Sequence, residues 1–505
     1  MPHRGARQPA GIIARMYLRA GVISLSLLLA SCVLGLLRES VQAATFGTTG
    51  LADLVVMMLT LPDLASAILA AGALSYALLP LWAGLPPPEL ARSQRLTGLL
   101  LLAIGAALAL VLWVAPLWAG HKLVPGASDS GALTLAMHWA APAIPLALLG
   151  SLWYTRLQHE RDAVGMYCMN IVHTGAIVLG MLALGHTEAV TVAVTWMGAA
   201  LLVALGLRLA FLRWRLARLV PAAAAVVGPA DTAAAAPAPQ VPGWRIWLWA
   251  TVSAGAPAAL VLLARSLVSN EGEGALAAFN YAWKLVELPN LLAIQLVATL
   301  AFPALTRARA EGRDFSVQLR AAFVLSWALA CAAAVGLWVG AQPAARLLFG
   351  WGRMTPDHVA QVAQWAAWGA WVLLPQALIA VAVLVLATVG RLRVAGWAFG
   401  GALAALAALG AAGLHDGRQV MIALGVILAV LALALLWSLG PRARQSLAWR
   451  DMAVPATLCG VLAALSTLLP AADLWLSLAA AALCAAAVLA GAWASSPALR
   501  AALKR

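Results

Sequence analysis

This chain of 505 residues is built from long, unbroken apolar runs such as LTGLLLLAIGAALALVLWVAPLW. Transmembrane β-strands would instead show alternating segments of about ten residues. A helix crosses the hydrocarbon core of a membrane with about 20 apolar residues. The sequence therefore predicts an all-α integral membrane protein with about fourteen transmembrane helices. The predicted spans are residues 20–37, 51–82, 96–119, 131–155, 163–185, 188–212, 246–269, 275–303, 318–341, 359–388, 394–413, 419–439, 452–470 and 473–494.

The composition agrees with a membrane protein. Hydrophobic residues make up 64% of the chain and charged residues 10%, whereas a soluble domain has about 25% charged residues. The first apolar run, followed by VQA at 41–43, imitates a secretory signal peptide with its cleavage site. Arg38 and Glu39 separate the run from that site, so we predict an uncleaved first transmembrane helix.

The basic residues alternate between the two sides of the predicted helices. With the N-terminus in the cytoplasm, 24 Lys and Arg residues fall in cytoplasmic segments and 5 in outer segments. Such an excess is typical of cytoplasmic loops. We therefore predict a multi-pass membrane protein with both termini in the cytoplasm. This distribution explains the net charge of +14 without a nucleic-acid partner. The outer residues are Arg38, Lys122, Arg346, Arg353 and Arg418.

A low-complexity Pro/Ala segment at 221–243 predicts a cytoplasmic linker between two six-helix lobes. Residues 1–220 would form the N-terminal lobe and 244–440 the C-terminal lobe, with two further helices in 441–505. LADLVVMMLTLPDL in the first lobe resembles AFNYAWKLVELPNL in the second, and each lies in the second helix of its lobe. Six helices per lobe give both lobes the same orientation, as in a parallel repeat with a pseudo-two-fold axis. Such repeats place the substrate site between the lobes, near the membrane midplane.

Ionisable residues within or beside the spans are functional candidates, because charge is unfavourable in lipid. Lys284 and Glu287 lie three residues apart on one helical face and are able to pair. These residues also have structural explanations. Lys284 and Glu287 would neutralise each other inside the protein, Arg38 would contact the outer lipid headgroups, and Asp53 would be an acid in the first turn of its helix that interacts with the helix dipole. The candidates for substrate binding are Arg38, Glu39, Asp53, Arg265, Lys284 and Glu287.

Motifs for covalent or metal chemistry are missing from the sequence. It contains no GxxxxGK[ST] loop, no Ser/His/Asp motif, and no CxxC or His/Cys cluster. His138 and His173, both in spans, are more typical of packed polar residues than of a proton relay. We therefore expect no enzyme activity, no metal and no cofactor, and an ATP-driven pump is disfavoured.

Two segments resemble a known family. LGLLRESVQAATFGTTGLADLVVMMLTLPDLASAILAAGALSYALLPLW resembles the N-terminal signature of the MurJ (MviN) lipid II flippases, within the multidrug/oligosaccharidyl-lipid/polysaccharide exporter superfamily. YAWKLVELPNLLAIQLVATLAFPAL resembles the family's Y-A-x-R-x-x-E-x-P segment. The remainder of the chain agrees only in topology. The matching residues expected to act in hinges or packing are Gly35, Gly47, Pro62, Gly72, Pro80 and Pro289.

The resemblance implies a mechanism in which the lobes alternate between inward- and outward-open states. A cationic central cavity would bind the headgroup of an undecaprenyl-diphosphate-linked saccharide, with the peptidoglycan precursor lipid II as the leading candidate. Arg38 would bind the diphosphate, Glu39 and Asp53 would be its partners or a gate, and Lys284 would face it from the other lobe. Membrane lipids are the other implied partners, and the implied location is the bacterial cytoplasmic (inner) membrane. Coupling to a monovalent cation or the membrane potential, and the oligomeric state, stay open.

The chain departs from the family pattern at several positions. Cys32 and Ser66 stand where the family generally carries arginines, and Ala71 stands where it carries an acid. Lys284 replaces an arginine, which keeps the charge but loses the bidentate fork; Arg265 would partly compensate. Two alternatives therefore stay open: a flippase for another lipid-linked glycan such as an exopolysaccharide or O-antigen unit, and a non-transporting envelope scaffold. A cation-coupled drug antiporter is disfavoured, because the sequence shows neither twelve helices nor a carboxylate-dominated cavity.

Overall fold

The computed structural model describes most of the chain as helix, and the described part contains no β-strand. Eleven of its helices are long and apolar enough to cross a membrane, or twelve when one bent pair counts as a single span. The prediction of an all-α membrane protein is confirmed. The described residues are 10–71, 74, 78–79, 81–83, 85–160, 162–185, 187, 189–226, 244–291, 316–441, 447–468, 473–497 and 499–500.

The N-terminal lobe follows the predicted spans. After Ser66 the second helix continues as one π-helical turn, η1 (Ala67–Ala71). The last helix continues into the segment predicted as a linker. The rest of that segment, 227–243, lies outside the described residues, as do Gly72 and Pro80. The helices are α1 (Ala10–Phe46), α2 (Gly50–Ser66), α4 (Pro87–Val114), α5 (Pro116–Leu123), α6 (Ser130–His159), α7 (Ala163–Leu184) and α8 (Val190–Val226).

The C-terminal lobe and the appended helices account for the other spans. The predicted span 359–388 is a broken helix, bent by 46° just before Pro375. The predicted span 275–303 is described only in its first part, since 292–315 lie outside the described residues. The elements are α9 (Trp244–Val268), η2 (Ser269–Glu271), α10 (Ala275–Pro289), α12 (Ser316–Phe349), α13 (Pro356–Ala370), α14 (Leu373–Thr388), α15 (Leu392–Ala411), α16 (Gly417–Ser438), α18 (Trp449–Ser466) and α19 (Leu474–Ser495).

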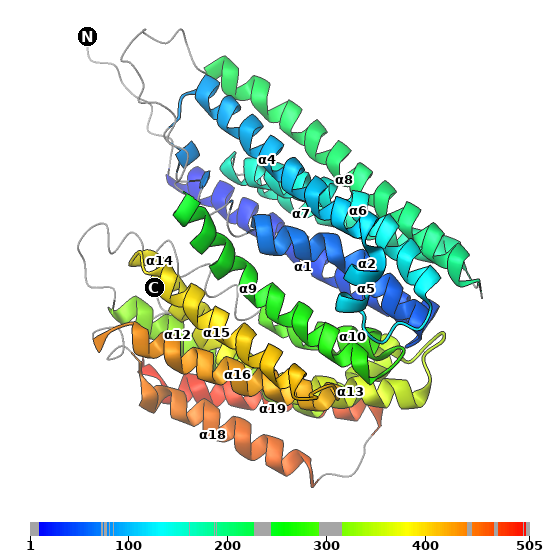
Figure 1. Ribbon diagram of the computed structural model, residues 1–505. Helices are drawn as coiled ribbons and strands as arrows, with labels where there is room; N and C mark the ends of the chain where they lie inside the picture. The colour runs from blue at the N-terminus through cyan, green and yellow to red at the C-terminus, as the bar shows by residue number, and fades with distance from the viewer. Residues whose placement is uncertain are drawn as a thin grey trace, which may run out of the picture.

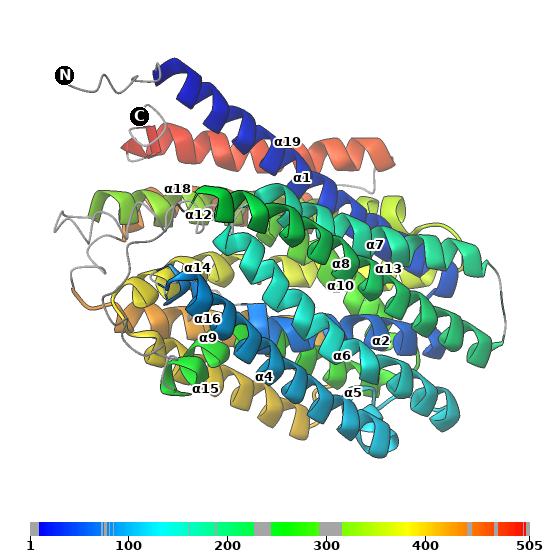
Figure 2. The same cartoon turned by 90° about the horizontal axis from the view of Figure 1, so that it is seen from above.

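The two lobes lie side by side, with α1 to α8 in one and α9 to α16 in the other (Figure 1). Most helices run along a common axis (Figure 2), as expected for helices that cross one membrane. α18 and α19 pack against α12, on the side of the C-terminal lobe away from α4 and α8 (Figure 1). This arrangement agrees with the predicted fold class, and the residue bounds of the lobes stay a prediction.

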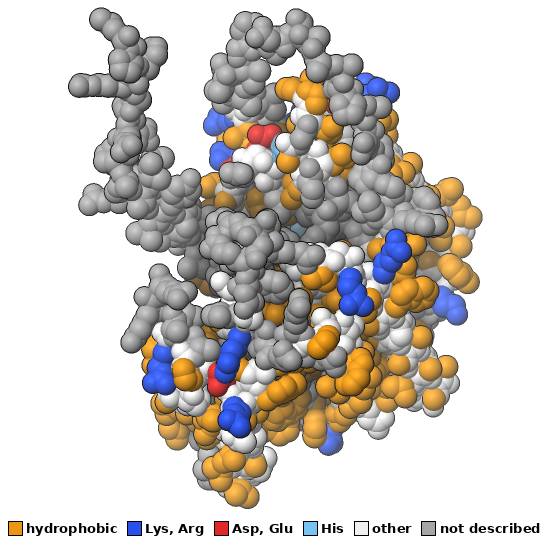
Figure 3. All heavy atoms as spheres, turned by 90° about the vertical axis from the view of Figure 1, so that its left-hand side faces the viewer, with side chains coloured by type: hydrophobic (Ala, Val, Ile, Leu, Met, Phe, Trp, Pro, Cys, Tyr) orange, Lys and Arg blue, Asp and Glu red, His pale blue; other side chains and the backbone are white. Residues whose placement is uncertain are grey.

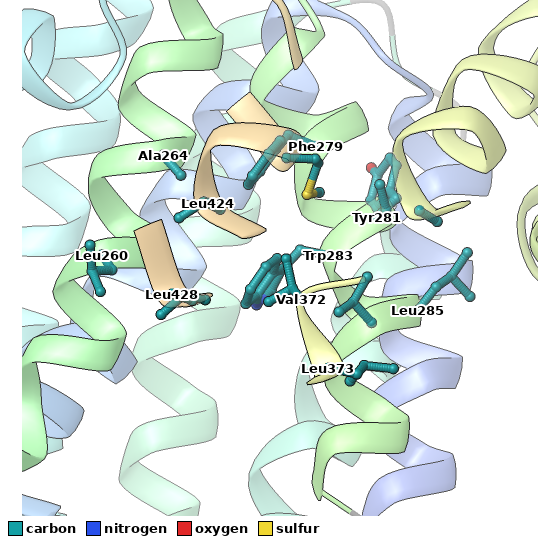
Figure 4. Packing of buried hydrophobic residues seen from close by; sticks show 14 of the residues in the cluster. Leu260, Ala264, Phe279, Tyr281, Trp283, Leu285, Val372, Leu373, Leu424 and Leu428 are labelled. Atoms are coloured by element: carbon teal, nitrogen blue, oxygen red, sulfur yellow. The ribbon is translucent and has the colours of Figure 1, made fainter. Parts of the chain in front are cut away.

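Large side chains fill the space between the helices of the C-terminal lobe. Phe279 and Trp283 of α10 lie beside Leu424 and Leu428 of α16 and Val372 at the start of α14 (Figure 4). All five are buried or half-buried. Helices in lipid associate through close packing rather than through release of water. This core therefore fixes α10, which carries Lys284 and Glu287, within its lobe.

Close packing of α4 on α6 leads to a stability prediction. A Cβ atom on Gly105 would lie 2.7 Å from Cα of Pro145, a contact that cannot form without a shift of backbone. We expect Gly105→Ala to destabilise the protein by about 1–3 kcal/mol, the usual effect of over-packing. Gly206→Ala is the matched control, because no heavy atom lies within 4 Å of its Cβ position. Thermal unfolding in detergent measures both, and equal melting temperatures would argue against the α4–α6 contact.

Candidate functional site

The lobes meet where α1 ends and α2 begins, at the right-hand end of Figure 1. The chain turns there through Gly47, whose φ of +65° lies in the left-handed region. Just before the turn, the carbonyl of Ala44 accepts a hydrogen bond from Arg353 N–H of the other lobe (2.9 Å). Trp351 Nε1 donates to Ser40 Oγ (3.0 Å), which adds a second bond across the same junction. The end of α1 is thus held against the loop between α12 and α13.

Asp53 of α2 makes the most extensive polar contact between the lobes. Its two carboxylate oxygens accept hydrogen bonds from the backbone N–H groups of Gly274 and Ala277, both at 2.7 Å. Gly274 is the N-cap of α10 and has a left-handed φ of 84°, with no side-chain cap of its own. The N-terminal lobe therefore supplies the helix cap that α10 lacks. Asp53 is 2% exposed, so these bonds form away from water.

Glu39 of α1 forms a second bridge between the lobes. One carboxylate oxygen accepts from Arg38 Nη2 (2.7 Å) and the other from Asn280 Nδ2 of α10 (2.8 Å). The next residue of α10, Tyr281, donates from its Oη to the carbonyl of Gly47 (3.2 Å). Sequence reasoning missed Asn280 and Tyr281 as bridging residues. In the two repeat segments aligned above, Asn280 stands at the position of Asp53.

Lys284 and Glu287 form the ion pair that their spacing predicts. Lys284 Nζ lies 2.7 Å from Glu287 Oε2. Glu287 also interacts electrostatically with Arg265 of α9 and with Arg38 of the other lobe. Arg265 is 4% exposed, and its Nε has no hydrogen-bond partner within the described chain. Five of the six predicted site residues therefore share one electrostatic cluster between the lobes, and Asp53 lies apart from it at the junction.

Two more charges, Asp63 and Arg208, extend this cluster into the N-terminal lobe. Asp63 of α2 interacts electrostatically with Arg38 and with Arg208 of α8, and all three interact electrostatically with His173 of α7. Arg208 is a correction to the topology analysis, which placed it in a cytoplasmic segment. It is 8% exposed within the apolar span Val190–Leu219. Its position inside the predicted span 188–212 was the available signal.

The cluster has little excess charge. Among the described residues it holds four cations and three carboxylates, so its formal charge is +1 with His173 neutral. Two of the positions that depart from the family pattern lie on the helices that carry Arg38 and Asp63. Cys32 of α1 is half-buried. Ser66 of α2 is buried, and its Oγ has no hydrogen-bond partner within the described residues.

Comparison with known families decides what kind of protein carries this cluster. The family model described as "Lipid II flippase MurJ" matches residues 42–477. The chain belongs to the MurJ lipid II flippase family. The matched range contains Asp53, Arg265, Lys284 and Glu287, and begins just after Arg38 and Glu39. No curated protein matches the chain.

Solved structures agree with the MurJ family fold. A lipid II flippase MurJ in an inward closed conformation has a TM-score of 0.72 at 14% identity, over 92% of this chain and 98% of that one. An inward-facing multidrug resistance transporter of the MATE family has a TM-score of 0.60 at 15% identity, over 82% and 94% of the two chains. A transporter of the same superfamily from Pyrococcus furiosus Vc1 has a TM-score of 0.53 at 15% identity, over 84% and 92%. At these identities the likeness concerns the fold alone.

Proposed function

We propose that this MurJ family member is a flippase that moves a polyprenyl-diphosphate-linked saccharide across the bacterial inner membrane by alternating access. The observation that carries the proposal is the shared cluster of Arg38, Arg265 and Lys284, which gathers cations from both lobes inside the apolar body. Ionisable groups at such depth are expensive unless they serve a charged ligand or each other. A diphosphate is the anionic ligand that the family's lipid-linked cargo would present.

Arg38 would link binding of the cargo to opening of the lobes. Glu39 holds Arg38 with one oxygen and Asn280 of the other lobe with its second oxygen. A diphosphate oxygen competes with Glu39 for the guanidinium, since both are anions that accept charge-assisted hydrogen bonds. Binding of the cargo would therefore loosen the Glu39 bridge and favour separation of the lobes at this end. The Asp53 contacts with α10 would form the main part of the gate.

We propose that the gate lies on the periplasmic side and that both termini lie in the cytoplasm. The opposite end of the molecule displays mainly basic side chains among its coloured charged residues (Figure 3), as the positive-inside rule requires of a cytoplasmic face. Single cysteines placed at residues 120–130 and 343–357 should react with a membrane-impermeant thiol reagent added to intact spheroplasts. Labelling only after the membrane is broken would reverse the orientation and overturn this part of the proposal.

Lipid II is the leading cargo, and another lipid-linked glycan is the second candidate. Cys32 and Ser66 support the second candidate, because two arginines that could clamp a diphosphate are replaced there. Each missing charge-assisted contact is worth about 1.5–3 kcal/mol, or roughly ten- to a hundredfold in affinity. Arg208 and Arg265, whose Nε atoms have no partner within the described chain, are the side chains that could replace those contacts.

The test is replacement of a cell's only lipid II flippase by this protein. We expect growth with normal peptidoglycan, because the cations at the lobe interface would still bind the diphosphate. The control is the Cys32→Arg/Ser66→Arg double variant, expressed to the same level in the membrane. Failure of the wild-type chain with rescue by the double variant would instead identify another lipid-linked glycan as the natural cargo.

A further inference from the structure

The C-terminal lobe has an apolar groove that the proposed transport path does not use. Its volume is about 480 Å³, and almost all of its lining is apolar. The groove lies where the broken span α13–α14 bends, with α12 on one side and α16 on the other. The residues that define it are Trp327, Trp371, Leu374, Leu378, Gly425 and Leu433.

The α16 side of the groove is exposed on the surface of the protein. Ile422, Val426 and Leu433 line it and are 38%, 59% and 64% exposed. In a chain that crosses the membrane, this surface faces lipid hydrocarbon rather than water. Its α16 side runs from Met421 to Leu433, which corresponds to about 18 Å at 1.5 Å per residue. One leaflet of a bilayer core is about 15 Å thick, so the groove is long enough to hold one lipid chain.

Arg418 lies at one end of this groove. Its guanidinium carbon is 4.7 Å from the ring centroid of Trp368, and Trp368 also lines the groove. Met421 and Ile422, three and four residues further along α16, share its helical face. A cation stacked on tryptophan at the end of an apolar groove matches a phosphate attached to a hydrocarbon chain.

Two carboxylates near Arg418 restrict the headgroup. Asp416 Oδ1 accepts from Gln419 N–H (2.7 Å), and Glu271 Oε2 accepts from Gly417 N–H (2.9 Å). Both therefore cap the start of α16, beside the cation. This mixture of charges favours a headgroup that carries an ammonium group as well as a phosphate, and disfavours one with additional negative charge.

We propose that this groove is a binding site for a zwitterionic membrane phospholipid. One acyl chain lies in the groove, the phosphate contacts Arg418, and the ammonium group lies on the side of Asp416. Occupancy would stabilise the 46° bend of the α13–α14 span, because the chain packs on both sides of the break. The site is separate from the cluster around Arg38 and Lys284, and its existence does not depend on the transported cargo.

Photo-crosslinking tests the proposal on the full-length protein. The probe is phosphatidylethanolamine with a diazirine in its acyl chain, and mass spectrometry locates the adducts. We expect adducts within residues 421–433, and unlabelled phosphatidylethanolamine should compete better than phosphatidylglycerol or undecaprenyl phosphate. Arg418→Gln should weaken labelling about three- to fivefold, the range for an exposed charge contact. Arg346→Gln, another exposed arginine of the predicted outer side, should leave it unchanged.

A filled groove gives an independent readout. Gly425→Leu places a side chain into the groove, and its Cβ makes only an ordinary contact of 3.9 Å with Val372. Ala429→Phe also fills the groove, from an exposed position, and replaces Gly425→Leu in the experiment if that variant unfolds. Both should abolish the groove adducts. Adducts that persist in them, labelling spread evenly over α15 and α19, or preferential competition by undecaprenyl phosphate would overturn the proposal.

Discussion

Asp53→Asn is expected to shift the protein strongly toward states that are open at the α1–α2 junction. The asparagine keeps the size of the side chain but loses the negative charge, and only its single oxygen accepts a hydrogen bond. Two charge-assisted bonds to α10 become one neutral bond. At about 1.5–3 kcal/mol for each charged bond and about 1 kcal/mol for the neutral bond, the closed state loses about 2–5 kcal/mol, or roughly 30- to 5000-fold in its population ratio. Transport should fall accordingly, because alternating access needs both states.

Distances between spin labels at Ser130 and Asp357 report this shift, since the two positions are exposed and lie in different lobes. Asp129→Asn is the matched control. Asp129 also accepts two backbone N–H bonds at a helix start, both at 2.9 Å, but within its own lobe. The Asp129→Asn variant should leave the distances between the spin labels unchanged. A wild-type distance distribution in Asp53→Asn would mean that this carboxylate does not hold the gate.

Lys284→Glu is expected to abolish transport while the protein remains in the membrane. The variant removes a cation from the cluster and places a second carboxylate one helical turn from Glu287, where the ion pair is now 2.7 Å long. The lost contact and the added repulsion should weaken binding of a diphosphate at least about 100-fold. Lys284→Arg should retain transport, because the guanidinium keeps the charge and adds bidentate geometry.

The charge swap Lys284→Glu/Glu287→Lys separates a binding role from a packing role. If the two side chains only neutralise each other's charge within α10, the swapped pair should restore transport to near the wild-type level. If Lys284 binds the cargo, the swap should restore protein stability but not transport. Lys122→Glu, in an exposed segment, is the control and should be neutral. Full activity of the swapped variant would remove Lys284 from the proposed site.

Local sequence patterns predicted the membrane architecture because each span is set by its own composition. The Lys284–Glu287 pair was also predictable from local sequence, because a spacing of three positions places both side chains on the same face of one helix. The Asp53 contact is different, because it joins residues 221 positions apart through a left-handed Gly274. An acid in the first turn of a helix is expected to interact with the N-terminus of its own helix. Here the packing of the lobes places the N-terminus of α10 against Asp53, so Asp53 caps α10 instead.

Arg208 shows a second limit of local reasoning. Arg208 was counted among the 24 cytoplasmic basic residues, although it lies inside the predicted span 188–212, near its end. The helix in fact continues to Val226, so Arg208 lies well within it and is buried next to α6, where Gly150 leaves room for its side chain. Helix ends are poorly determined by apolar length when basic residues follow without a Gly or Pro stop signal.

The most direct test of the proposed function is movement of lipid II by the purified protein in proteoliposomes. Fluorescent lipid II is placed in one leaflet, and its exposure in the other leaflet is followed with an impermeant quencher. We predict transfer by the wild-type chain, loss of transfer in Lys284→Glu, and retention in Lys284→Arg. Absence of transfer for lipid II and for other undecaprenyl-diphosphate saccharides, with a correctly folded and inserted protein, would contradict the assignment as a flippase.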